Sequence, residues 1–380
     1  MGCDTIVTPH REDEETDRKM SILGDNMANI KVIGVGGGGV NAVNRMISSG
    51  VTGVEFVVMN TDHHVLELSP CRARLQLGPN TLRGLGAGGD PCLGRAAADE
   101  SRPEIRRILE GADMVFIAAG MGGGTGTGAA SVIAEMSREA ETLTVSVVTK
   151  PFFFEGPQRS SVAESGISEL REQVDTLIVI PNDRLLSVVD KRAPLTDAFT
   201  VADDVLRQGV QGISDIITIP GLINIDFNDV KSIMADKGTA LMGIGLANGE
   251  QRAAHAAEQA CASPLLETTI DGAKAVLVNI TGGPDLMLSE VSEAAEIVYK
   301  ACDVDKVNVI LGAVIDPEMQ EGVKITVVAT GFDSRERRVL VEAKAGAMSE
   351  FGGISQLEGP VLIDSESELE IPAFLRRQHR

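Results

Sequence analysis

Two glycine-rich segments carry the residues best suited to chemistry. Residues 34–39 read GVGGGG and match the pattern G-x-G-x-x-G, and residues 120–128 read GMGGGTGTG. Without Cβ atoms the backbone can approach a phosphate closely, and successive N–H groups form a concave anion site. The first segment alone is equally typical of a tight turn. Two such segments favour a di- or triphosphate ligand, and the P-loop class is disfavoured because no G-x-x-x-x-G-K-[ST] pattern occurs.

An acidic segment is the second candidate for chemistry. Residues 224–229 read NIDFND, so Asp226 and Asp229 stand three positions apart. Two carboxylates at this spacing can be directed at one water or one cation. The alternative is helix capping, with Asn228 or Asp229 as the N-cap of a helix over 230–234. Within a single chain we favour capping, because a long predicted helix separates this segment from the glycines.

The elements around the glycine segments alternate between strands and helices. Short apolar runs predict strands at 30–35, 54–59, 114–119, 143–148 and 177–180, and helical spacing predicts helices at 40–47, 129–139 and 162–172. This alternation predicts an α/β fold with a parallel sheet covered on both faces. Both glycine segments then lie at C-terminal ends of strands, where open α/β sheets bind their ligands.

The second half of the chain has a different pattern. One long helix is predicted over 196–218, with an apolar stripe that ends before Pro220 and Gly221. Strands at 275–280, 307–313 and 324–329 and helices at 252–261 and 290–302 predict a second, smaller α/β domain. The long helix would join the two domains.

The two ends of the chain are predicted to be disordered. Residues 1–29 are a polar, acidic arm, and residues 332–366 are an acidic linker without apolar periodicity. The last residues, 367–380, contain the apolar and basic sequence IPAFLRRQ, which predicts a peptide that docks on a partner.

Composition excludes several classes of function. With 34 Lys and Arg against 55 Asp and Glu, the net charge of −21 repels phosphate backbones, and 3% aromatic residues leave few base-stacking platforms. We therefore expect no nucleic-acid partner. The five cysteines form no C-x-x-C pair, so we predict neither disulfides nor a protein-held metal site. No apolar run is long enough to span a bilayer, and the expected location is the cytoplasm.

The sequence GMGGGTGTG resembles the signature of the tubulin/FtsZ superfamily. The resemblance covers about residues 30–331 and the tail. The chain is similar in particular to bacterial FtsZ proteins. It extends through the segments NTD (60–62), TLRGLGAG (81–88), FEG (154–156), IPND (180–183), NIDFND (224–229) and IPAFLRRQ. It implies a Rossmann-like GTPase domain over 30–195, a central helix over 196–218 and a C-terminal activation and polymerisation domain over 219–331.

The resemblance also implies roles for individual residues. The nucleotide would be held by the first glycine loop, by the signature loop at its β- and γ-phosphates, and by Glu155 and Arg159 at its ribose and phosphates. Asn182, Phe199 and Asp203 would read or cover guanine, whose N1–H and N2–H₂ donors suit a carboxylate. The loop residues are Gly37, Gly38, Gly39, Val40 and Asn41, followed by Gly124, Thr125 and Gly126.

Some of these positions have structural alternatives or depart from the family pattern. Phe199 could belong to the core, and Arg159 could be a solvated charge at a helix start. Val40 stands where the family usually has Gly or Asn, and a backbone N–H contact would survive this change. Pro157-Gln158 replaces a typically basic pair, which puts the nucleotide affinity in doubt.

The mechanism that the resemblance implies uses two subunits. Subunits would stack head-to-tail, and Asp226 and Asp229 of one would orient water at the GTP of the next, with Mg²⁺ on the nucleotide. GTP hydrolysis to GDP and phosphate would then depend on assembly into the division ring at mid-cell. Residues 370–378 would dock on membrane-tethering division proteins, with no direct membrane insertion.

Two rival classes of function remain open at this stage. A Rossmann-type NAD(P) enzyme is supported by residues 34–39 alone and leaves the second glycine segment unexplained. A nucleotide-binding scaffold with little hydrolysis fits both segments.

Overall fold

The computed structural model describes residues 28–186, 194–219, 221–223, 225–263, 266, 270–302, 307–317, 319 and 321–332. The predicted linker and docking peptide, and the arm up to residue 27, lie outside the described residues. Asn29, at the end of the predicted arm, is already tied to the fold. Its backbone N–H donates to Asp113 Oδ2 at 2.8 Å, and its side chain donates to the Gly111 carbonyl at 2.9 Å.

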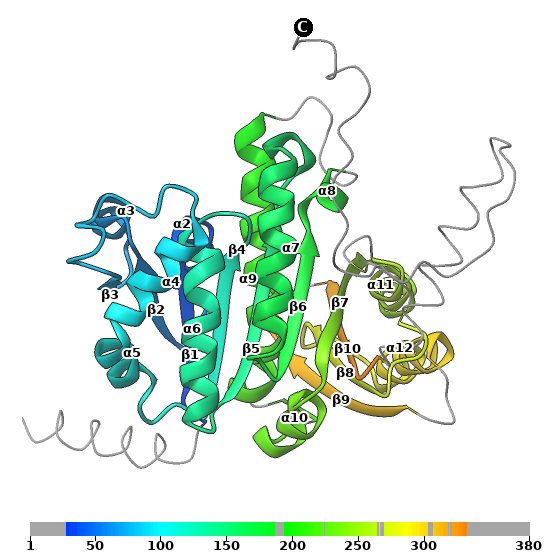
Figure 1. The fold of residues 1–380 in the computed structure, drawn as a ribbon. Coiled ribbons are helices and arrows are strands. Elements are labelled where there is room, and N and C mark those ends of the chain that lie inside the picture. The colour runs from blue at the N-terminus through cyan, green and yellow to red at the C-terminus, as the bar shows by residue number, and fades with distance from the viewer. Residues whose placement is uncertain are drawn as a thin grey trace, which may run out of the picture. The chain divides into compact units, whose positions relative to one another are not determined.

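Six parallel strands form the N-terminal part of the sheet (Figure 1). Their order is β3-β2-β1-β4-β5-β6, the order of Rossmann folds, in which ligands bind where the chain reverses between β1 and β4. The predicted α/β class is confirmed. The strands are β1 (Ile30–Val35), β2 (Glu55–Asn60), β3 (Ala73–Gln76), β4 (Met114–Gly120), β5 (Leu143–Lys150) and β6 (Thr176–Pro181).

The C-terminal strands continue the same sheet. Strand β7 (Gly238–Asn248) pairs in parallel with β6 over three residues and then antiparallel with β10 (Gly322–Thr330), which pairs with β8 (Ala275–Gly282). Strand β9 (Asn308–Ile315) closes this edge, so the described strands form one ten-stranded sheet. The boundaries of the predicted domains stay a prediction.

Strand β7 was not predicted from the sequence, because it contains glycines that weaken the strand pattern. Two of them are required by packing. A Cβ on Gly243 would lie 1.9 Å from the Ala260 carbonyl oxygen, and one on Gly245 would lie 1.9 Å from that of Ala256. Helix α11 (Arg252–Cys261) therefore lies directly on the backbone of β7.

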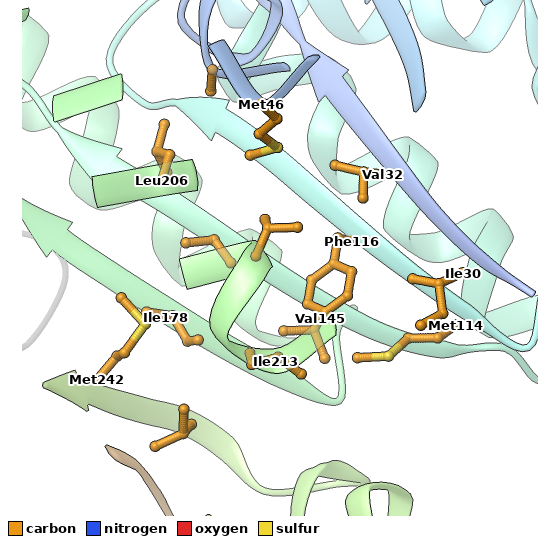
Figure 2. Packing of buried hydrophobic residues seen from close by; sticks show 14 of the residues in the cluster. Ile30, Val32, Met46, Met114, Phe116, Val145, Ile178, Leu206, Ile213 and Met242 are labelled. Carbon is orange, nitrogen blue, oxygen red and sulfur yellow. The ribbon is translucent and has the colours of Figure 1, made fainter. Parts of the chain in front are cut away.

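Helices cover both faces of the parallel strands. Successive residues of a strand face opposite sides, so Val32 packs towards α2 and α9, and Ile33 towards α4 to α7. Figure 2 shows Phe116 beside Val145, Ile30 and Met114 on the first side, with Met46 and Leu206 further along the same cluster. The helices are α2 (Gly36–Ser48), α3 (His63–Leu68), α4 (Pro91–Glu100), α5 (Arg102–Leu109), α6 (Thr125–Glu139), η1 (Phe153–Glu155), α7 (Pro157–Arg171), α8 (Asn182–Leu185), α9 (Leu195–Thr218), α10 (Phe227–Met234), α11 and α12 (Leu288–Ala301). None of these helices is both long and apolar enough to cross a membrane.

The two helices that follow the glycine segments begin earlier than the sequence predicted. Helix α2 starts at Gly36 rather than residue 40, and α6 starts at Thr125 rather than residue 129. Glycine has the lowest helix propensity after proline, so the pattern alone places these residues in loops. The correction matters for function, because the glycine segments themselves form the first turns of the two helices.

Asp215 is a buried carboxyl on α9, 8% exposed. Burial raises its pKa to about 6, and Asp316 adds to the rise, whereas Lys324, Gln211 and Arg207 oppose it. The folded-state pKa lies above the unfolded value of 3.8. The contribution of Asp215 to the free energy of unfolding is therefore fully present below pH 3.8 and is lost as pH rises through about 6.

We therefore expect Asp215→Asn to raise the free energy of unfolding at pH 7.5, by roughly 1–3 kcal/mol. At pH 5 the carboxyl is mostly protonated in the folded protein but ionised in the unfolded one, so the difference between variant and wild type should be about half of that at pH 7.5. Urea unfolding of both proteins at the two pH values measures this. An equal difference at both pH values would contradict the assignment.

A candidate nucleotide site

A cavity of about 350 Å³ lies at the C-terminal ends of β1 and β4, where the two glycine segments meet. It contains eleven of the thirteen residues predicted to bind nucleotide. The lining residues are Gly37, Gly38, Asn41, Gly120, Met121, Gly123, Gly124, Thr125, Gly126, Thr149, Pro151, Glu155, Arg159, Asn182, Phe199, Ala202, Asp203 and Leu206.

The first glycine segment is shaped by close backbone contacts. Gly36 has φ +69°, and a Cβ there would lie 2.7 Å from the Gly126 backbone nitrogen, so only glycine fits. Gly39 and Val40 are the two predicted residues that the structure does not bring to the cavity. Gly39 packs on the Ala118 carbonyl, where a Cβ would lie at 2.2 Å, and Val40 is fully buried in the core. Their contact with nucleotide stays a prediction.

The second glycine segment leads into helix α6. Gly124 is its N-cap and provides no side-chain cap, so first-turn N–H groups remain for an anion at the cavity. The Thr125 hydroxyl lies 2.6 Å from that of Thr61, and the Thr127 hydroxyl accepts from the Gly122 N–H at 2.9 Å. Thr127 therefore supports the loop, and Thr125 lines the cavity.

Glu155 and Arg159 form an ion pair at the side of the cavity. Arg159 Nη1 donates to Glu155 Oε2 at 2.6 Å, and Glu155 Oε1 accepts from the Phe152 N–H at 2.9 Å. The Glu155 side chain is held in place and 14% exposed, whereas that of Arg159 is 58% exposed. The exposed guanidinium can turn towards an anionic ligand.

The far end of the cavity suits a flat heterocycle with hydrogen-bond donors. Asn182 is 5% exposed, and its Oδ1 has no partner among the described residues. Phe199 is 41% exposed and lies edge-on to Phe152 at 5.4 Å between ring centroids. Burial raises the pKa of Asp203 to about 6, with Arg45 opposing the shift. A buried acceptor without a partner and a half-buried carboxyl both indicate that a donor-bearing ligand completes this end.

Asp226 and Asp229 lie outside the cavity. Asp226 is the N-cap of α10, and its Oδ1 accepts from the Asp229 N–H at 2.8 Å. The sequence placed the cap at Asn228 or Asp229, which is wrong, because the helix begins at Phe227, three residues earlier than predicted. Both carboxylates are exposed, at the opposite end of α9 from the cavity (Figure 1).

Sequence reasoning missed several lining residues. Thr149 and Pro151 lie at the C-terminal end of β5 and could have been found, because parallel strands end at the same edge of a sheet. Ala202 and Leu206 lie three and seven residues beyond Phe199, on the same face of α9. Within the described part of the chain no three His, Cys, Asp or Glu residues come together as a metal site.

A Rossmann-ordered sheet whose two glycine loops meet at one cavity, beside a long central helix, defines a tubulin-like GTPase. Residues 29–190 match the model of the Tubulin/FtsZ family, GTPase domain, and residues 238–333 match that of the FtsZ family, C-terminal domain. The chain belongs to the FtsZ family. It is thus a tubulin-like cytoskeletal GTPase that binds guanine nucleotide.

Solved structures agree with this membership. An empty FtsZ dimer from M. jannaschii is 42% identical, with 86% of this chain and 94% of that chain covered and a TM-score of 0.79. A point mutant of the same FtsZ is also 42% identical, with 85% and 96% covered and a TM-score of 0.78. CetZ1 from Haloferax volcanii, a GDP-bound monomer, is 19% identical, with 83% of this chain and 99% of that chain covered and a TM-score of 0.70. It shares the fold.

Proposed function

We propose that this chain polymerises head-to-tail with GTP, and that GTP is hydrolysed at the interface between subunits. One observation carries the proposal: Asp226 and Asp229 are exposed at one end of α9, and the cavity lies at the other. The 24 residues of α9 span about 36 Å. An acidic pair so far from its own nucleotide can serve only the nucleotide of a neighbour.

Each part of the proposed site has a chemical role. Water attacks the γ-phosphorus, and the bond to the oxygen bridging the β- and γ-phosphates breaks, giving GDP and phosphate. Asp226 and Asp229 orient and polarise the water. Oδ1 of Asp226 accepts the N-cap bond from the Asp229 N–H, and Oδ2 is the oxygen proposed to face the water. The N–H groups of residues 124–126 stabilise the charge that develops on the phosphates.

Mg²⁺ fits this scheme as a companion of the nucleotide. The described residues form no metal-binding cluster of their own, and Mg²⁺ is often bound through substrate phosphates. It would neutralise phosphate charge when bound. Thr125, which lines the cavity, is the residue that we propose would face it.

Assembly of this kind is expected to produce filaments. A contact that joins opposite ends of identical subunits does not close on itself. An FtsZ relative at 42% identity is described as a dimer, which supports self-association. We propose that the filaments form the division (Z) ring in the cytoplasm at mid-cell.

GTP turnover per protomer should depend steeply on protein concentration. Below the concentration at which filaments form, we expect turnover at least roughly 100-fold lower, because the water-orienting pair is missing from every cavity. Phosphate release and light scattering, measured over a dilution series with GTP, GDP, ATP or NAD, provide the test. Equal turnover in dilute and concentrated protein would refute the composite site, and assembly without phosphate release would favour the scaffold alternative.

The C-terminal tail is proposed to connect the filament to the membrane through tethering proteins. Residues 370–378 combine Ile371, Phe374 and Leu375 with Arg376 and Arg377, a pattern typical of docking peptides. Deleting residues 369–380 should leave polymerisation unchanged and abolish recruitment to membranes that carry the tether. Co-sedimentation with such vesicles measures recruitment, and unchanged recruitment would contradict the assignment.

A further inference from the structure

Helix α10 carries the acidic pair at its N-terminal end. Asp226 is the N-cap and Asp229 lies in the first turn. The Asp226 carboxylate accepts from the Asp229 N–H, and both side chains are exposed. The place of the pair relative to the sheet is therefore set by the loop before the helix and by how the helix itself is held.

The C-terminal end of α10 is held by two threonine hydroxyls from different strands. The last carbonyl groups of a helix have no partner within the helix. In α10 the Met234 carbonyl accepts from Thr176 Oγ1 of β6 at 2.5 Å. The Ile233 carbonyl accepts from Thr330 Oγ1 of β10 at 2.9 Å. This end of the helix is thereby tied to both the parallel and the antiparallel part of the sheet.

Both of these hydrogen bonds are buried. Thr176 and Thr330 are 0% exposed, and so are Ile233 and Met234. A buried carbonyl that loses its donor has no water to replace it, so the loss carries the full cost of an unmade hydrogen bond. Without the hydroxyls, the helix end would therefore shift towards other donors.

The turn that follows α10 is held by Asp175, the residue before β6. The Asp175 carbonyl accepts from the Lys237 N–H at 3.0 Å, and Asp175 Oδ1 accepts from the Asp236 N–H at 3.3 Å. Asp175 Oδ2 accepts from the Thr144 N–H of β5 at 2.8 Å. The C-terminal end of α10 and its exit are thus fixed against the sheet, at the opposite end of the helix from the acidic pair.

We propose that Thr176 and Thr330 are positioning residues for GTP hydrolysis, because their hydroxyls fix the end of α10 opposite the acidic pair. The inference rests on the proposed function, in which Asp226 and Asp229 act on the nucleotide of a neighbouring subunit. Helix α10 is about 12 Å long, so a tilt at its C-terminal end displaces the pair. A displacement of about 1 Å can lower a rate by up to about 100-fold. Neither threonine lines the cavity, so the effect falls on hydrolysis and not on GTP binding.

The test compares Thr176→Val and Thr330→Val with Thr144→Val in the full chain. Valine has the branched shape of threonine and favours strands equally, but it has no hydroxyl to donate. Thr144 is the matched control, because it is also 0% exposed and its hydroxyl bonds Thr142 and Ser137, away from α10. All three variants should be less stable to urea than wild type, because each loses a buried hydrogen bond.

Turnover in filaments should separate the three variants. Phosphate release is measured at saturating GTP, well above the critical concentration, so that changes in assembly do not enter. Turnover per subunit should fall about tenfold in Thr176→Val and in Thr330→Val, and stay within about twofold of wild type in Thr144→Val. GTP affinity should stay within about twofold of wild type in all three. Thr176→Ser keeps the hydroxyl and should recover most of the lost turnover.

Asp226→Asn, measured beside these variants, separates this inference from the proposed function. Wild-type turnover in Asp226→Asn would refute the proposed function and the role of α10 with it. Slow turnover in Asp226→Asn, with wild-type turnover in either clamp variant (Thr176→Val or Thr330→Val), would overturn the positioning role alone. An equal loss in Thr144→Val, or no recovery in Thr176→Ser, would also overturn it, because turnover would then follow stability and not the hydroxyls.

A measurement on wild type covers a failure of the valine variants to fold. The Ala235 N–H donates to the Lys231 carbonyl at 2.8 Å in the last turn of α10, and the Asp229 N–H donates to Asp226 in the first turn. In dilute, unassembled protein with GDP, the Ala235 N–H should exchange at least about tenfold more slowly than the Asp229 N–H, after correction for intrinsic rates. Equal exchange at the two positions would overturn the assignment, because the C-terminal end of α10 would not be the fixed one.

Discussion

Asp226→Asn is expected to bind GTP as wild type does and to hydrolyse it roughly 10²–10⁴-fold more slowly, the usual contribution of a group that activates the attacking water. The substitution removes the negative charge and keeps the side chain's shape. Asparagine is as good an N-cap as aspartate, so the start of α10 should be preserved. The effect would then report on the charge and not on the fold. Phosphate release and equilibrium binding of a fluorescent GTP analogue measure the two quantities.

Two outcomes would contradict the role assigned to Asp226. Loss of GTP binding would show that the residue acts on its own nucleotide, and an unchanged rate would show that it does not act at all. Asp226→Ala provides the comparison for the cap, because alanine removes the bond to the Asp229 N–H and should also cost about 1 kcal/mol of stability.

Asp203→Asn is expected to change the base preference of the cavity from guanine to xanthine. Guanine presents two donors, N1–H and N2–H₂, whereas xanthine presents the N1–H donor and a carbonyl oxygen at position 2. An amide can accept from N1–H and donate to that oxygen. Losing a bond to an ionised acceptor should weaken GTP binding by about 10–100-fold, and the variant should bind XTP in preference. Competition of GTP and XTP for a fluorescent analogue measures the change.

Asp204→Asn is the matched control, one residue further along α9. Asp204 bonds Arg207 and Gln208 on its own helix and does not line the cavity, so this variant should keep the preference for GTP.

Burial raises the pKa of Asp203 to about 6, so wild-type affinity for GTP should fall as pH drops below 6, by up to about tenfold per unit. XTP binding by Asp203→Asn should lack this dependence. A preference for GTP that survives in Asp203→Asn would contradict the assignment.

The two variants together test the composite site directly. Asp226→Asn protomers hold GTP but contribute no intact acidic pair, and Asp203→Asn protomers contribute the pair but hold XTP. In an equal mixture with both nucleotides, about a quarter of the wild-type GTP hydrolysis should return if filaments mix at random. Neither variant alone should hydrolyse GTP at a comparable rate. A mixture as inactive as its components would count against hydrolysis between subunits.

The sequence alone determined the fold class and the end of the sheet at which ligand binds. Fully apolar runs such as 30–35 and 114–119 can be satisfied only as strands buried on both faces, and glycines after such strands mark the ligand edge. Of the nucleotide-binding residues assigned by resemblance, the cavity gathers all except Gly39 and Val40, and those gathered include Asn182, Phe199 and Asp203.

Tertiary structure alone decided which glycines face a ligand and which face another backbone. Gly37 and Gly38 line the cavity, whereas Gly39, Gly243 and Gly245 are small because a carbonyl oxygen lies where a Cβ would be. A one-dimensional pattern does not distinguish the two uses, because both need only the absence of a side chain. The same holds for Asp226, which caps α10 only because that helix starts at Phe227. Which glycine meets a carbonyl oxygen is set by packing between distant segments, which no local spacing encodes.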